Sequence, residues 1–143
     1  KIHFDCSLDP EMLVYADRTH LSLVMQNLIS NAIKFTQQQG KIQTYASQQD
    51  NMTTICVADN GVGIASQRLS DLFQIETSFS TVGTANEKGT GLGLILCNEL
   101  VLENGGQIWA ESSLGEGSRF YFTLPSSIQA LAVLNEDSRA RKN

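Results

Sequence analysis

Residues 26–36 of the chain read QNLISNAIKFT, and this stretch is the first indication of the fold. It lies within residues 21–35, where apolar side chains recur at helical spacing. The residues on this apolar face are Leu21, Val24, Met25, Leu28, Ala32 and Phe35. Asp17 or Thr19 can cap the N-terminus of such a helix. The pattern therefore predicts an amphipathic helix that buries one face in a core.

Three polar side chains follow one edge of this predicted helix. Asn27, Asn31 and Lys34 have the spacing i, i+4 and i+7, which places them within about 60° of one another around the axis. Amide oxygens suit Mg²⁺, and a lysine can meet the phosphates that Mg²⁺ also binds. Alternatively, these are boundary residues that bond to neighbouring loops. The stripe alone favours that interpretation.

Two glycine clusters follow the helix along the chain. Residues 59–64, DNGVGI, come directly after an apolar strand pattern. Glycines allow a close backbone approach to a flat ligand, and Asp59 can accept a hydrogen bond from an exocyclic amine such as that of adenine. A plain β-turn explains the same residues equally well.

The second cluster, residues 89–94, reads GTGLGL and opens a helical pattern. Free backbone amides and the helix dipole make such an N-terminus a phosphate site. It is neither a Walker loop nor a dinucleotide-binding fingerprint, because the spacing and the following residues differ. The alternative is a hinge at the end of the polar segment 76–89, whose length indicates a functional or mobile loop.

The remaining pattern predicts an α+β fold. Strands are expected at 2–8, 12–15, 41–47, 52–58, 107–111 and 118–124. Helices are expected at 21–35, at 66–72 and after the glycine cluster that ends at residue 94, the last of them stopped by Gly105 and Gly106. We expect a two-layer α/β sandwich, with a mixed, mostly antiparallel sheet of about five strands covered on one face by about three helices. Residues 1–125 form the expected domain, and residues 126–143 a C-terminal tail or linker.

Composition limits the classes of partner. The formal charge of −5 argues against nucleic acid, and no apolar run is long enough to cross a bilayer. Cys6, Cys56 and Cys97 are widely spaced among apolar neighbours, which predicts buried, reduced thiols and no metal site.

Taken in order, the motifs resemble the histidine kinase catalytic domain, within the superfamily of gyrase, heat-shock chaperone, histidine kinase and mismatch-repair ATPases. Residues 26–36 resemble its N box, residues 59–64 its first glycine box and residues 89–94 its second. Residues 115–118, before Phe120, resemble its last glycine motif. The resemblance covers residues 1–125 and implies the Bergerat ATP-binding fold.

The resemblance implies roles for particular residues. Asn31 would be the Mg²⁺ ligand, with Asn27 as a possible second, and Lys34 would contact phosphate. Asp59 would accept from the adenine amine, and residues 76–89 would form an ATP lid. The other implied nucleotide contacts are Phe35, Gly61, Gly63, Ile64, Lys88, Gly89, Thr90, Gly91, Leu92, Gly93, Leu94 and Ser118. The family's aromatic pair is incomplete, since Phe73 has no aromatic neighbour before Phe79.

The implied activity is transfer of the γ-phosphoryl group of Mg-ATP to a histidine on a separate dimerisation domain. ATPase relatives carry a glutamate base at the position of Asn27, so this chain should hold ATP without fast hydrolysis. His3 and His20 lack the neighbours of an acceptor histidine. The expected setting is a cytoplasmic, monomeric domain with a response regulator or receiver domain downstream. A degenerate nucleotide sensor, an ATPase or an anti-sigma serine kinase are the alternatives.

Overall fold

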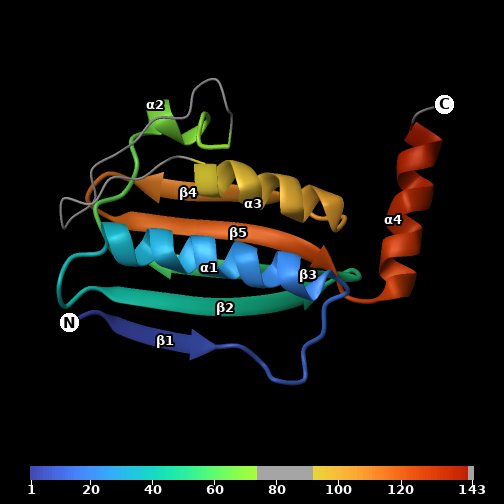
Figure 1. Ribbon diagram of the computed structural model, residues 1–143, viewed down its shortest axis with the longest axis horizontal. Helices are drawn as coiled ribbons and strands as arrows, with labels where there is room; N and C mark the ends of the chain where they lie inside the picture. Colours follow the sequence, from blue (N-terminus) through green and yellow to red (C-terminus); the bar gives the residue numbers. More distant parts are fainter. Residues whose placement is uncertain (74–91, 142–143) are drawn as a thin grey trace.

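The computed structural model describes residues 1–73 and 92–141 (Figure 1). Its elements are β1 (His3–Ser7), α1 (Arg18–Phe35), β2 (Lys41–Gln49), β3 (Met52–Asp59), α2 (Ser66–Leu69), α3 (Leu92–Glu103), β4 (Ile108–Ser113), β5 (Gly117–Pro125) and α4 (Ile128–Arg141). The predicted elements at 21–35, 41–47, 52–58, 107–111 and 118–124 are confirmed with small shifts of their ends.

The strands form one five-stranded sheet in the order β1-β2-β3-β5-β4. β1 pairs with β2 in parallel, and the other pairs are antiparallel, so the predicted mixed sheet is confirmed. β2 and β3 are joined by Asp50 and Asn51, whose φ values of 52° and 70° are typical of a two-residue hairpin turn.

One face of the sheet packs against helices α1 and α3, which lie side by side in Figure 1. Alternate residues of the strands point to this face. The buried cluster consists of Val24, Leu28, Ala32, Ile42, Ile55, Val57, Cys97, Leu100, Val101, Phe120, Phe122 and Leu124. The apolar stripe predicted for α1 is therefore the surface that closes the core.

Local chemistry sets the ends of α1 and α3. Asp17 caps α1, since its carboxylate accepts from the backbone N–H of His20 at 2.9 Å. α3 ends in a Schellman motif, in which the N–H of Gly106 donates to Val101 and that of Gly105 to Leu102. Gly105 has φ +85°, which explains why glycine stands there.

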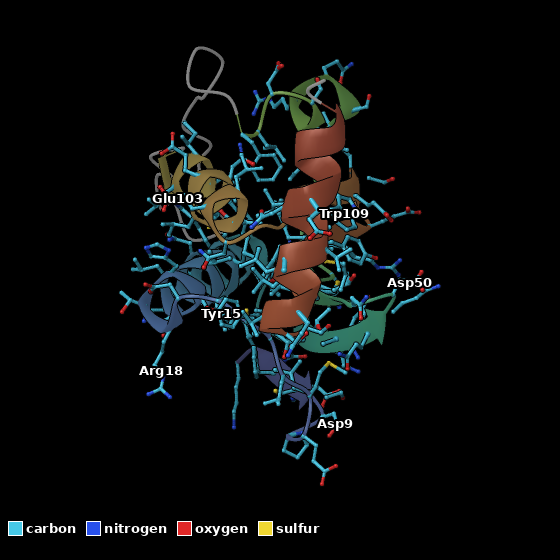
Figure 2. The ribbon with its side chains drawn as sticks, turned by 90° about the vertical axis from the view of Figure 1, so that its right-hand side faces the viewer. Asp9, Tyr15, Arg18, Asp50, Glu103 and Trp109 are labelled. Carbon is cyan, nitrogen blue, oxygen red and sulfur yellow. The ribbon has the colours of Figure 1, made fainter. Side chains whose placement is uncertain are left out.

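The opposite face carries an aromatic row. Trp109 stacks on Tyr121 with ring centroids 5.4 Å apart, and Tyr45 and Cys56 continue the row across the sheet. Figure 2 shows Trp109 on the side of the sheet opposite to Arg18 of α1 and Glu103 of α3.

Three expectations differ from the structure. Residues 12–15 form no strand, because a turn at Asp9 redirects the chain and, in the described residues, Tyr15 makes the segment's one backbone hydrogen bond to the sheet, to Pro125. No helix is expected after residue 125, whereas the structure forms α4 there, and Ala130 on it is buried. Cys6 is exposed on the edge strand β1, whereas Cys56 and Cys97 are buried as predicted. None of the helices in the described residues is long and apolar enough to cross a membrane.

Candidate functional site

Asp59 ends strand β3 on the helix-covered face of the sheet. Its register partners are Ile42 on β2 and Ser118 on β5, and Ile42 is fully buried under the helices. One carboxylate oxygen of Asp59 accepts from the backbone N–H of Gly61 at 2.9 Å. The turn interpretation is thus correct as local structure, and it holds the carboxylate against its own strand end.

Burial makes the Asp59 carboxylate an unusual group. Desolvation raises its pKa above the ordinary value for aspartate, and hydrogen bonds from the backbone N–H groups of Gly61 and Ser118 oppose that rise. An ionised carboxylate in this position has lost part of its water shell. It therefore gains from a donor such as an amine that enters the site.

The glycines at 61 and 63 are required by the packing of the turn. A Cβ on Gly61 would lie 2.1 Å from the carbonyl oxygen of Phe35, at the end of α1. Gly63 has φ +76°, and a Cβ there would lie 2.0 Å from the carbonyl oxygen of Ser113. The N–H of Val62 also donates to Phe35 at 3.1 Å. The turn is therefore closely packed between the end of α1 and the β4–β5 hairpin.

Ser112 joins this turn to the sheet, and the sequence analysis missed it. Its hydroxyl donates to the carbonyl of Gly117 at 2.8 Å and accepts from the N–H of Ile64 at 2.8 Å. Its single proton is then used, so Ser118 donates in their 2.8 Å contact. Ser118 is only 7% exposed, and donating to Ser112 leaves both lone pairs of its oxygen to accept from a water or ligand. Only the strand register could have revealed Ser112.

Asn27 presents its amide oxygen toward the start of α3. Its Nδ2 donates to the carbonyl of Leu23, 2.9 Å away in the preceding turn. A carbonyl only accepts, so this contact fixes the orientation of the carboxamide. Its Oδ1 lies 2.9 Å from where a Cβ on Gly93 would stand. The second glycine cluster and the N-box-like helix are therefore in contact.

Asn31 and Lys34 lie further along α1 and are half-buried. α1 and α3 run antiparallel, since Val24 meets Cys97 while Asn27 meets Gly93. Asn31 lies one turn beyond Asn27 along α1. Because the helices are antiparallel, Asn31 lies beyond the N-terminal end of α3, where the first backbone N–H groups lack intrahelical partners. The Lys34 ammonium lies 5.8 Å from the Phe35 ring centroid.

Part of the predicted site lies outside the described residues. This applies to Lys88, Gly89, Thr90 and Gly91, to the predicted lid at 76–89 and to Phe79. α3 begins at Leu92, and Gly93 and Leu94 occupy its first turn. Phe73 packs edge-on against Phe120, with centroids 6.5 Å apart.

A polar pocket of about 400 Å³ opens at the strand ends. Asp59, Asn60 and Ser118 line it together with Glu111 and Arg119. Arg119 follows Ser118 along β5, so its side chain points to the other face of the sheet. None of the N-box-like residues lines this pocket, so it extends behind the Asp59 turn instead of toward α1.

The side chains on α1 fit a magnesium ion held with phosphates. Asn27 offers an oriented amide oxygen, and Asn31 lies one turn away. Mg²⁺ prefers such oxygen ligands and takes the rest of its shell from water and phosphate. In the described residues, no group of three or more His, Cys, Asp or Glu side chains could hold a metal alone.

The chain is similar to a known protein family and to individual proteins of cyanobacteria. A family model described as histidine kinase-, DNA gyrase B- and HSP90-like ATPase matches residues 16–128. The phytochrome-like protein Cph1 of Synechocystis is 43% identical over 114 residues, covering 78% of this chain and 15% of Cph1. The adaptive-response sensory kinase SasA of Prochlorococcus marinus is 35% identical over 129 residues, covering 87% of this chain and 34% of SasA.

Solved structures agree with the family match. The catalytic domain of histidine kinase ThkA superposes with a TM-score of 0.74 at 33% identity, covering 90% of this chain and 82% of that one. ThkA in complex with the response regulator protein TrrA superposes with a TM-score of 0.70 at 29% identity, covering 88% of this chain and 34% of that one. The chain therefore spans about four fifths of one solved catalytic domain but only 15% of Cph1 and 34% of SasA.

Proposed function

This chain belongs to the family of histidine kinase-, DNA gyrase B- and HSP90-like ATPases, and we propose that it is the Mg-ATP-binding catalytic domain of a sensor histidine kinase. In this proposal the γ-phosphoryl group passes to a histidine on a separate phosphoacceptor domain of the same protein. The chain resembles histidine kinase catalytic domains over most of its length.

The observation that carries the proposal is the contact between the Asp59 turn and the end of α1. The carbonyl oxygen of Phe35 accepts from Val62 and lies too close to Gly61 for any side chain there. This contact brings the Asp59 carboxylate to the same end of the domain as Asn31 and Lys34. Asp59 could then bind the base of the same nucleotide whose phosphates are bound by Asn31 and Lys34.

Asn27 supports a kinase over an ATPase. A carboxamide does not take up a proton at neutral pH, so it cannot serve as general base for water. The site would then keep ATP until a histidine nucleophile arrives. Positioning and the charge of the metal would supply the catalysis, since phosphoryl transfer depends chiefly on both.

We expect Mg²⁺ to strengthen binding of an unhydrolysable ATP analogue through Asn31. Asn31→Ala should remove most of the Mg²⁺-dependent part of the affinity, about tenfold, while ADP binding without metal changes by less than about threefold. Calorimetric titration with and without Mg²⁺ measures both quantities. Gln38→Ala, at an exposed position after the helix, is the matched control. An undiminished metal effect in Asn31→Ala would remove Asn31 from the metal site.

Phosphoryl transfer should require a second domain. The chain alone should bind ATP but incorporate no label from γ-labelled ATP, whereas mixing it with the phosphoacceptor domain of its full-length protein should label a histidine there. The acid lability of the label identifies phosphohistidine. Tight binding without transfer would favour a nucleotide-sensing module. Rapid phosphate release by the isolated chain would favour an ATPase, and an acid-stable phosphoserine on a partner would favour a serine kinase.

The proposal also includes a response regulator or receiver domain as the next partner, as for ThkA with TrrA. It places the domain in the cytoplasm, where ATP is available and where thiols such as Cys56 and Cys97 stay reduced. We further propose that residues 1–125 are the catalytic domain and that residues 126–143, which include α4, are a C-terminal tail or linker.

A further inference from the structure

Asn104, just after α3, ties the end of that helix to the start of α1. Its Oδ1 accepts from the backbone N–H of Asp17 at 2.8 Å, and its Nδ2 donates to the carbonyl of Leu100 at 2.7 Å. An N–H only donates and a carbonyl only accepts. These two contacts therefore fix which way the carboxamide points.

The same Nδ2 lies 3.0 Å from Nδ1 of His20. Since Nδ2 can only donate, Nδ1 of His20 must be a bare acceptor in this contact. The ring is then neutral, with its proton on Nε2. Turning the Asn104 amide over would not relieve this requirement, because Oδ1 would then face the carbonyl of Leu100.

A second partner for the same ring nitrogen lies beside the first. Glu103 Oε2 is 4.0 Å from Nδ1 of His20, and a carboxylate can only accept. A protonated Nδ1 would lose the Asn104 contact and gain this one. Both partners come from the C-terminal end of α3, so exchange between them needs only side-chain movement.

The charges around the ring oppose one another. Asp17 and the C-terminal dipole of α3 favour a cation here, as does Glu103, while the N-terminal dipole of α1 disfavours it. The backbone hydrogen bond from His20 lowers the pKa of Asp17, so that carboxylate is ionised in either state of the ring. The His20 side chain is 31% exposed, and the small pocket that it lines also contains the apolar residues Leu21, Val24 and Leu100.

We propose that His20 is a proton-dependent switch whose Nδ1 bonds to Asn104 when neutral and to Glu103 when protonated, and so sets how firmly α3 is tied to α1. Protonation of His20 leaves the Asn104 side chain with its contacts to Asp17 and Leu100 but without its contact to His20. α1 and α3 carry Asn27 and Gly93, so the switch acts on the two helices that form the candidate site. The inference does not require that the site binds a nucleotide.

Nitrogen NMR of the imidazole rings tests the neutral state. At pH 8 we expect His20 to be almost entirely the Nε2–H tautomer, with Nδ1 unprotonated. His3, exposed on β1 and the only other histidine, provides the internal comparison, and His3→Gln confirms the assignment. Predominance of the Nδ1–H tautomer at His20 would overturn the proposal.

A pH titration tests the exchange of partners. The side-chain amide signals of Asn104 should change with the same midpoint as the His20 ring, and His3→Gln should leave that midpoint unchanged. Glu103→Gln, at an exposed position, should move the midpoint to lower pH by about 0.2 to 0.7 units, as for an exposed ion pair. The proposal would be overturned if the Asn104 signals did not change with the His20 titration, or if Glu103→Gln left the His20 midpoint unchanged.

Discussion

Asp59→Asn is expected to weaken ADP binding by about 10- to 100-fold while leaving the empty domain at least as stable as the wild type. A hydrogen bond to a charged group contributes about 1.5–3 kcal/mol, and each 1.4 kcal/mol corresponds to a tenfold change in affinity. Asparagine has nearly the same shape and can still accept from Gly61 through its amide oxygen. The variant therefore removes the charge and leaves the turn intact.

The stability of the Asp59→Asn variant follows from the direction of the pKa shift. Burial raises the pKa of Asp59, so the folded state binds its proton more tightly than the unfolded chain. The stability that this group adds is present below the ordinary aspartate pKa of about 3.9 and is lost as the pH rises through the raised pKa. At neutral pH the ionised carboxylate is a net cost, which asparagine removes.

Calorimetric titration with ADP and urea unfolding at pH 7 measure the two effects of this substitution. Asp5→Asn, exposed on β1, is the matched control and should change neither quantity. Wild-type ADP affinity in Asp59→Asn would show that the carboxylate does not recognise the base. A loss of stability with intact affinity would assign Asp59 to the fold alone.

Gly61→Ala is expected to be a strongly damaging substitution in the candidate site. The new Cβ would lie 2.1 Å from the carbonyl oxygen of Phe35 and 2.9 Å from a carboxylate oxygen of Asp59. The first contact is with backbone, so either the end of α1 or the turn must move. Overpacking of this kind costs about 1–3 kcal/mol of unfolding free energy, and it displaces the Asp59 carboxylate as well. Urea unfolding and ADP titration should both show losses.

Gly93→Ala is the matched control for Gly61→Ala. Among the described residues, its Cβ would meet only the side chain of Asn27, whose oxygen would lie 2.9 Å away, and a small shift of that side chain can relieve the contact. Alanine is also a better helix former than glycine. We expect its unfolding free energy to stay within about 1 kcal/mol of the wild type. Equal destabilisation by Gly61→Ala and Gly93→Ala would contradict the packing described for the Asp59 turn.

The family and the architecture could be predicted because their signals are local. The helical period of residues 21–35, the glycines that end α3 and the strand patterns at 41–47 and 52–58 each depend on neighbours a few residues apart. The same holds for the motifs at 26–36, 59–64 and 89–94, whose order along the chain indicated the family. The pattern of residues 12–15 predicted a strand that the structure does not form. The backbone of this segment makes one hydrogen bond to the sheet, from Tyr15 to Pro125, whereas a strand needs a series of them.

Sequence alone thus determined helices α1, α2 and α3, all five strands, the sheet class and the chemistry of the side chains offered to a ligand. Tertiary structure decided which of these residues meet. Ile64 and Ser112 are 48 residues apart, and Asp17 and Asn104 are 87 apart, yet each pair is joined by one hydrogen bond. Such contacts depend on strand register and helix packing, which arise only when the whole core is buried. No local pattern in the chain encodes them.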